Sequence, residues 1–274
     1  MSLPENVEDD EDCMSFFEKF SYDTFPSKHL KYLEIPAWDC RESLEEEPVL
    51  HMSDRDVTDD DAVALGRAMS IIKPEQLTRL YMTRNKLTDK GCAALAQGCA
   101  DCPNFEMFYM QLNQIGDMGL IAIASSMKFS TMYQLVLTEN CVTDLGVKEL
   151  AKSIADGVSF LHLKHLYIDT MEGITDEGCA ALAKVLHCLP ELEILALQKC
   201  KIGNKGIVAL AEAIAKGGCF KKGGNNWLYV FDNPFDDEAK KALRDACRGH
   251  IKAHVGWPAP MEGVDFEPEL GRRD

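Results

Sequence analysis

The sequence predicts an α/β fold in which about seven strand–turn–helix units stack side by side. Three observations carry this prediction. Residues 87–96 (LTDKGCAALA) and 174–183 (ITDEGCAALA) are nearly the same decapeptide. Further copies lie between and beyond them at nearly constant spacing, which is typical of a repeat architecture. In each copy, apolar residues alternate as in a half-buried strand, and a helix-like stretch rich in Ala and Leu follows.

The spacing defines the extent of the repeats. The five clearest copies end at a glycine, namely Gly91, Gly119, Gly146, Gly178 and Gly206. The steps between these glycines are 28, 27, 32 and 28 residues. Two weaker copies flank the five, so we expect a repeat domain over residues 47–246.

Within one unit, the residue pattern predicts a strand, a tight turn and a helix in that order. Leu80 and Met82 alternate as one buried face of a strand does. Asn85 follows where the chain leaves the strand, and its amide can both donate to and accept from the peptide groups of the turn. Thr88 and Asp89 form a good N-cap pair for the helix. One unit cannot bury its apolar face alone, whereas a stack of units forms a continuous core.

The pattern L-x-x-L-x-L-x-x-(N/C)-x-L, followed by a helix led by Asp-x-Gly, resembles the leucine-rich repeat. The period near 28 and the alternation of Asn and Cys resemble its ribonuclease-inhibitor-like class. The resemblance implies a curved right-handed solenoid, or horseshoe, with a parallel sheet on the concave face and helices outside. It implies little about activity, because one fold serves many functions.

The segments outside the repeats differ in composition. Residues 1–24 open with an acidic run and are expected to be disordered, although FFEKF at 16–20 favours local order. Residues 25–46 are expected to cap the first unit together with FFEKF, because LKYLEI repeats the strand spacing. Residues 247–274 contain three prolines and little periodicity, which predicts an extended tail with Trp257 anchored on the last unit.

The net charge of −16 disfavours binding to nucleic acid or to anionic membranes and favours a protein partner with a basic surface. Residues 42–48 and 54–61 are acidic patches that are either solvated faces or docking surfaces. No apolar run of 18 residues and no signal-peptide pattern is present. We therefore expect a cytoplasmic or nuclear protein that is not secreted, does not span a membrane and is monomeric by itself.

The eleven cysteines are mostly expected to be small packing residues between stacked units, because several occupy repeat positions. Disulfides are the alternative, but the count is odd and no export signal accompanies it. Cys99 and Cys102 have metal-ligand spacing without a second pair, so we expect no metal site and no cofactor.

Strand residues that point away from the core should line the concave face. One such column holds His51, Tyr81, Tyr109, Val136, Tyr167, Ala196 and Tyr229. Exposed Tyr, Met and Trp are typical of protein-binding hot spots, although aromatic residues also stabilise a sheet without any ligand. The candidate partner-binding residues are Tyr81, Tyr109, Tyr167, Tyr229, Met107, Ile194, Trp227, Phe231, Arg79, His165, Gln111 and Asp169.

The motifs G-x-x-x-x-G-K-[ST], H-E-x-x-H and G-x-S-x-G are absent from the sequence, so we expect no enzymatic activity. The favoured function is a non-catalytic interaction module or scaffold that binds a protein on its concave face. Two alternatives stay open. One is a GTPase-activating or other regulatory protein resembling Ran GTPase-activating proteins, for which Arg79 and Arg84 lie near the inner face. The other is a structural subunit of a cytoskeletal or ciliary assembly.

One irregularity interrupts the Asn positions. The repeat step of 32 contains an extra residue around Asp169–Gly173, where the other units have Asn or Cys. This insertion is either a local bulge or a functional projection.

Overall fold

The protein is described by a computed structural model over residues 11–19, 49–127, 131–157, 159–247 and 251–255. Within this part of the chain, eight parallel strands form one sheet in chain order. The strands are β1 (Val49–His51), β2 (Arg79–Tyr81), β3 (Met107–Tyr109), β4 (Gln134–Val136), β5 (His165–Tyr167), β6 (Ile194–Ala196), β7 (Asn226–Tyr229) and β8 (Ile251–His254).

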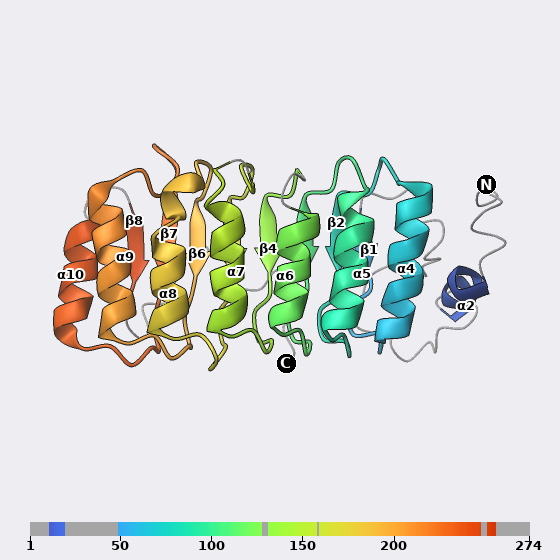
Figure 1. Ribbon diagram of the computed structural model, residues 1–274, viewed down its shortest axis with the longest axis horizontal. Coiled ribbons are helices and arrows are strands. Elements are labelled where there is room, and N and C mark those ends of the chain that lie inside the picture. The colour runs from blue at the N-terminus through green and yellow to red at the C-terminus, as the bar shows by residue number, and fades with distance from the viewer. Residues whose placement is uncertain (1–10, 20–48, 128–130, 158, 248–250, 256–274) are drawn as a thin grey trace, which may run out of the picture.

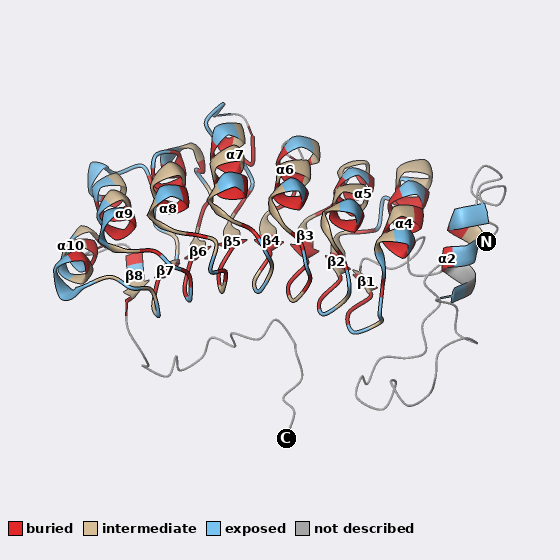
Figure 2. Cartoon of the chain, turned by 60° about the horizontal axis from the view of Figure 1, so that its bottom comes forward, coloured by how far each residue is buried: buried red, intermediate tan, exposed pale blue. Residues whose placement is uncertain are grey.

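A helix follows each strand from β1 to β7, and these helices cover one side of the sheet (Figure 1). The helices are α4 (Asp59–Ile72), α5 (Asp89–Ala100), α6 (Asp117–Ser126), α7 (Asp144–Ile154), α8 (Asp176–Ala183), α9 (Asn204–Lys216) and α10 (Asp237–Cys247). A short 3₁₀ helix, η3 (Leu186–Cys188), follows α8. The helices lie on the outer arc and the strands on the inner one (Figure 2), which confirms the predicted α/β solenoid.

The core lies between the sheet and the helices. The middle residue of every repeat strand is fully buried, as shown by Leu50, Leu80, Phe108, Leu135, Leu166, Leu195 and Leu228. Helix leucines meet them from the outer side: Leu65, Leu95, Leu150, Leu182, Leu210 and Leu243 are also fully buried. Each such side chain stabilises the fold by roughly 1.5–3 kcal/mol relative to exposure. Because every unit contributes to the same interior, the core is continuous along the stack.

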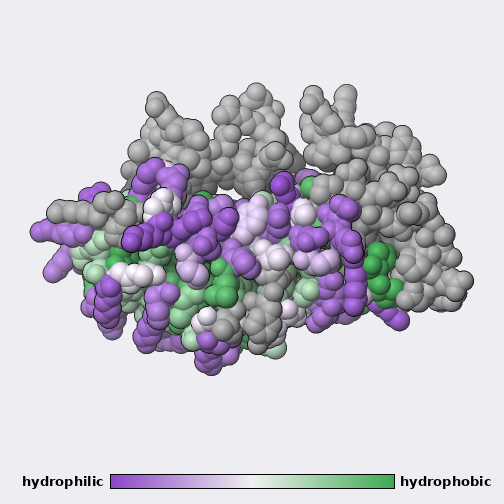
Figure 3. Space-filling model, turned by 90° about the horizontal axis from the view of Figure 1, so that it is seen from above, coloured by the Kyte–Doolittle hydropathy of each residue, from purple (hydrophilic) through white to green (hydrophobic). Residues whose placement is uncertain are grey.

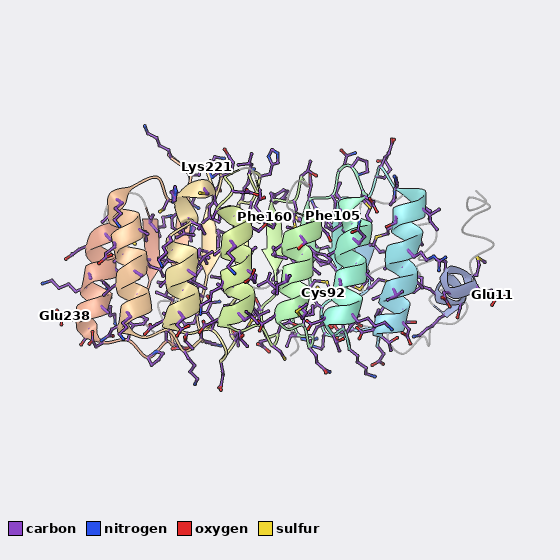
Figure 4. All side chains as sticks on the ribbon, in the orientation of Figure 1. Glu11, Cys92, Phe105, Phe160, Lys221 and Glu238 are labelled. Carbon is purple, nitrogen blue, oxygen red and sulfur yellow. The ribbon has the colours of Figure 1, made fainter. Side chains whose placement is uncertain are left out.

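The strand-to-helix turns form one edge of the solenoid, which we call the turn edge. These turns comprise residues 52–58, 82–88, 110–116, 137–143, 168–175, 197–203 and 230–236. At the opposite edge, the return edge, each helix leads back to the next strand. Glu238 marks the turn edge at the bottom of Figure 4, and Lys221 marks the return edge at the top.

Buried or partly buried asparagines join neighbouring turns, as the sequence predicted. The Asn113 side-chain oxygen accepts from the Leu87 N–H at 3.1 Å, and its amide donates to the carbonyls of Met82 at 2.9 Å and Met110 at 3.1 Å. The same arrangement recurs at Asn85, Asn140 and Asn233. Each asparagine therefore satisfies the peptide groups of two units at once. In one unit a cysteine takes this place, and the Cys200 thiol donates to the Gln198 carbonyl at 3.5 Å.

These turns hold the backbone in an unusual conformation. Each turn has a non-glycine residue with a positive φ between 52° and 60°, namely Asp54, Arg84, Leu112, Glu139, Thr170, Lys199 and Asp232, and the first turn has a second one, Asp56. The left-handed region costs a residue with a side chain about 1–2 kcal/mol. Where the turn contains the asparagine, its hydrogen bonds stabilise the turn and offset this cost.

The aspartate that begins most of the repeat helices binds backbone N–H groups of the next unit rather than those of its own helix. The Asp144 carboxylate accepts from the backbone N–H groups of Thr175 at 2.8 Å and Gly178 at 2.9 Å. Helix α7, which begins at Asp144, is instead capped by Thr143, whose hydroxyl accepts from the Leu145 N–H at 3.2 Å. The predicted Thr-Asp cap pair is thus corrected: the threonine caps its own helix and the aspartate caps the following one.

This inter-unit contact explains the glycine of the Asp-x-Gly motif. A Cβ atom on Gly178 would lie 2.5 Å from the Asp144 side-chain oxygen. Real Cβ atoms do not approach other atoms this closely, so the position accepts only glycine without rearrangement.

The structure differs from the expectations for both ends of the chain. Residues 11–19 form helix α2 (Glu11–Lys19): disorder was predicted for residues 1–24 as a whole, whereas order was expected for FFEKF at 16–20, and Phe16 lies in this helix. Phe16 and Cys13 are buried, and the Cys13 thiol donates to the Ala64 carbonyl of α4 at 3.2 Å. At the other end, β8 falls in the segment predicted to be an extended tail and pairs with β7. The predicted cap at 25–46 and Trp257 lie outside the described residues.

Candidate functional site

The register of the sheet places the predicted inner-face residues in straight columns. Tyr81 pairs with His51 on one side and with Tyr109 on the other. Val136, Tyr167, Ala196 and Tyr229 continue the same column. Because the middle residue of each strand points into the core, its two neighbours point to the inner face. The alignment of the tyrosines across adjacent parallel strands is confirmed.

The first group of aromatic rings is stacked. The ring centroids of His51 and Tyr81 are 4.9 Å apart, and those of Tyr81 and Tyr109 are 4.3 Å apart with nearly parallel planes. Val136 ends this stack on β4, so Tyr167 stands apart on β5. Burial raises the pKa of Tyr167 to about 12 and also raises the pKa of Tyr109. Both phenols therefore remain protonated near neutral pH.

A second aromatic group lies at the C-terminal end of the inner face. The Trp227 and Tyr229 rings have centroids 5.9 Å apart and nearly parallel planes. His254 of β8 lies 5.9 Å from Trp227, and the Lys252 ammonium lies 4.5 Å from the Trp227 ring centre. Sequence reasoning missed Lys252 and His254 because β8 lies outside the repeat period. The alternation in Ile251–His254, with a buried residue followed by an exposed one, is the signal that could have identified the strand.

The predicted site residues divide by accessibility. Eight are partly exposed on the inner face, namely Arg79, Tyr81, Met107, His165, Tyr167, Ile194, Trp227 and Phe231. Four are buried, with exposed fractions of 5% for Tyr109, 2% for Tyr229, 5% for Gln111 and 2% for Asp169. The structure thus brings all twelve to one face but leaves only the first eight available for direct contact.

The insertion at Asp169–Gly173 is a local bulge. The Asp169 carboxylate accepts from the hydroxyls of Thr138 at 2.8 Å and Thr170 at 2.9 Å. Burial raises the pKa of Asp169, and these two hydrogen bonds oppose that rise. Met171 points into the core with 2% exposure. These contacts hold Asp169 and Met171 against the stack, whereas the Glu172 side chain is exposed.

His165 of β5 lies near the middle of the inner face. His165 lies 3.0 Å from the Gln134 side-chain oxygen, and burial lowers the pKa of His165. A neutral imidazole is therefore favoured there at pH 7.

At the turn edge, Arg84 donates to both carboxylate oxygens of Asp54 at 3.1 and 3.2 Å, which occupies the guanidinium group.

The thiols within the described residues are free and mostly buried. Burial raises the pKa of Cys102 to about 12 and places that of Cys99 well above its usual value. Protonated thiols are poor metal ligands. Across the described ranges, no group of three or more His, Cys, Asp or Glu side chains could hold a metal ion. Nor does any helix there have the length and apolar character needed to cross a membrane.

Comparison with known proteins agrees with the fold. Residues 76–96, 102–124 and 190–211 match the family described as Leucine Rich repeat. Ribonuclease inhibitor of Sus scrofa is 24% identical over 194 residues, which cover 70% of this chain and 41% of that protein. Ribonuclease inhibitor of Mus musculus is 27% identical over 175 residues, or 63% of this chain and 36% of that protein.

NACHT, LRR and PYD domains-containing protein 3 of Bos taurus is 28% identical over 174 residues, covering 61% of this chain and 16% of that protein. The chain therefore spans less than half the length of each of these three relatives.

Proposed function

Because the chain is a leucine-rich repeat protein of the ribonuclease-inhibitor-like class, we propose that it is a non-catalytic module whose inner face holds one protein partner. Two of its relatives are inhibitors of another protein by name, which agrees with a binding role. The observation that carries the proposal is the row of partly exposed Tyr81, Met107, Ile194 and Trp227 on one face of the sheet.

The inner face suits binding because its side chains are already ordered. Ring stacking holds Tyr81 against Tyr109, and packing against Lys252 and Tyr229 holds Trp227. Aromatic side chains fixed before binding lose little conformational entropy when a partner covers them. Their apolar surface and their polar tips can then both contribute to affinity, as in other protein-binding hot spots.

The charge of the chain supports a basic partner. The formal net charge is −16, and such a field accelerates the approach of a positively charged surface. The contacts at the centre of the face are uncharged tyrosine, methionine and isoleucine side chains. We therefore assign steering to the overall charge and affinity to the central side chains.

The test compares two triple variants, each of which replaces three large side chains with serine. The first carries Tyr81→Ser, Met107→Ser and Ile194→Ser on the inner face. The control carries Met118→Ser, Leu145→Ser and Val208→Ser, three exposed hydrophobic residues on the helices. The partner is identified by affinity capture from the native source, and its Kd for each purified variant is then measured.

We expect the inner-face variant to bind about 100-fold more weakly, since two or three hot-spot side chains are worth roughly 3 kcal/mol together. The control variant should bind as the unaltered chain does. Circular dichroism and thermal unfolding confirm that both variants fold. Equal affinity of the folded inner-face variant and the control would place the binding site elsewhere.

A further inference from the structure

A cleft of about 410 Å³ opens at the return edge beside β4 and β5. It is lined by Thr131, Tyr133, Leu161, His162, Lys164, Pro190 and Glu191.

One wall of the cleft is apolar. Leu161 is 40% exposed, and Pro190 is exposed beside it. Seen from above, the return edge is mostly hydrophilic and strongly hydrophobic residues show through at only a few places (Figure 3). Of the four large hydrophobic residues exposed in the described part of the chain, Leu161 is the one that lines this cleft. It therefore offers apolar surface where a partner's side chain can be partly enclosed.

The polar side chains of the cleft that can bind a ligand, Lys164, His162 and Tyr133, are hydrogen-bond donors. The Lys164 ammonium lies 5.4 Å from the centre of the Tyr133 ring, and it forms no ion pair with any described carboxylate. His162 is exposed beside it. Burial and the charge of Glu106 raise the pKa of Tyr133, so its hydroxyl keeps its proton near neutral pH.

The one carboxylate among the residues that line the cleft is already paired with a lysine. Glu191 pairs with Lys221 at 2.9 Å, and Lys221 also pairs with Glu193 at 3.1 Å. Hydrogen bonding and charge from Lys221 lower the pKa of Glu191, with smaller contributions from Lys164 and His162. Glu191 therefore stays ionised and bound to Lys221, and Lys164 is left to meet an external anion.

The donor groups are held in place. The Tyr133 ring meets the His165 ring edge to face, with centroids 6.2 Å apart. The Lys164 ammonium also lies over the Tyr133 ring. The backbone of Lys164 directly precedes β5 and is held by a hydrogen bond, in which its N–H donates to the Tyr133 carbonyl at 2.8 Å. A ligand that meets Lys164 and Tyr133 thus meets groups that are ordered before binding, which favours affinity.

We propose that this cleft binds a short peptide segment of a partner in which a large apolar residue lies next to a carboxylate. The apolar side chain packs on Leu161, Pro190 and the Tyr133 ring. The carboxylate accepts from the Lys164 ammonium and the Tyr133 hydroxyl, with His162 at the rim. The cleft is open to solvent, which suits side chains of an extended peptide. This site is separate from the inner face and does not depend on the function proposed above.

The test is a selection from a phage library of random heptapeptides on the full chain. Counter-selection uses the double variant Leu161→Asp, Lys164→Glu, so that only cleft-dependent peptides survive. We expect the enriched peptides to place Asp or Glu beside Leu, Ile, Met, Phe or Trp. The synthetic consensus peptide should bind Lys164→Glu about tenfold more weakly than the unaltered chain, because a charge-assisted hydrogen bond becomes a repulsion.

Two matched controls make the result decisive. Lys205→Glu reverses the charge of an exposed lysine on α9, and Val208→Asp alters an exposed hydrophobic residue on the same helix. Both should keep the affinity of the unaltered chain, and thermal unfolding shows that each variant is folded. The proposal is overturned if no peptide survives counter-selection, if the survivors lack acidic residues, or if Lys205→Glu weakens binding as much as Lys164→Glu does.

Discussion

At the turn edge every strand-to-helix turn has the same length except 168–175, whereas at the return edge the connections vary from 73–78 to 155–164. The turn edge also repeats its chemistry: an asparagine joins most pairs of turns, and a helix-leading aspartate caps the next helix. The return edge has individual contacts instead, such as the hydrogen bond from the Thr131 hydroxyl to the Phe105 carbonyl at 2.7 Å.

The difference shows where each unit is fastened to the next. Contacts at the turn edge are made inside the stack by buried polar groups, so each one stabilises two units. Contacts at the return edge are closer to solvent, and loops there can change in length at little cost. One edge therefore fixes the stacking, while the other is free to acquire features such as the cleft beside Tyr133.

The largest effect expected from this comparison concerns two asparagines. Asn113→Ala at the turn edge leaves the Leu87 N–H and the Met82 and Met110 carbonyls without their partner in a buried setting. We expect a loss of about 3 kcal/mol in the free energy of unfolding. Asn104→Ala at the return edge removes one exposed hydrogen bond, to the Glu75 carbonyl at 2.9 Å, and should change stability by less than about 0.5 kcal/mol.

Urea unfolding followed by circular dichroism measures both changes. The difference between the edges is refuted if Asn104→Ala destabilises the chain as much as Asn113→Ala.

A smaller effect is expected for the contact between Asp144 and Gly178. Gly178→Ala brings a Cβ atom within 2.5 Å of the Asp144 oxygen and should cost about 2 kcal/mol. Asp144→Ala removes the acceptor for the Thr175 and Gly178 N–H groups and should cost about 1–2 kcal/mol. In the double variant the clash is absent, so the two losses should fall short of their sum by about 1 kcal/mol.

A double-mutant cycle of unfolding free energies checks this coupling. Strict additivity would show that Gly178 is required for another reason than the approach of Asp144.

The repeats themselves could be predicted from the sequence because their physical requirements recur in every unit. The buried leucines, the asparagines of the turns and the column through Tyr81 and Tyr167 all follow from one period. The role of the aspartates could not be assigned in the same way. Asp144 fits a cap of its own helix equally well in sequence, and only the stacking distance shows that it reaches Gly178.

Features that occur once gave no such signal. For helix α2 only FFEKF at 16–20 indicated local order, and its start at Glu11 and the packing of Cys13 on α4 were not predicted, because neither belongs to a repeat. Strand β8 lies beyond the last unit. The burial of Gln111 and Asp169 on the inner face also escaped prediction, because alternation along a strand indicates which side a residue faces but not how deeply it lies.

The most direct test of the proposed function is site-specific photo-cross-linking to the captured partner. A benzophenone amino acid is placed in turn at Tyr81 and Trp227 on the inner face and at Val208 on the outer helices. We expect the partner to be cross-linked from Tyr81 and Trp227 and not from Val208. Cross-links confined to Val208, with Tyr81 and Trp227 silent in folded protein, would contradict binding on the inner face.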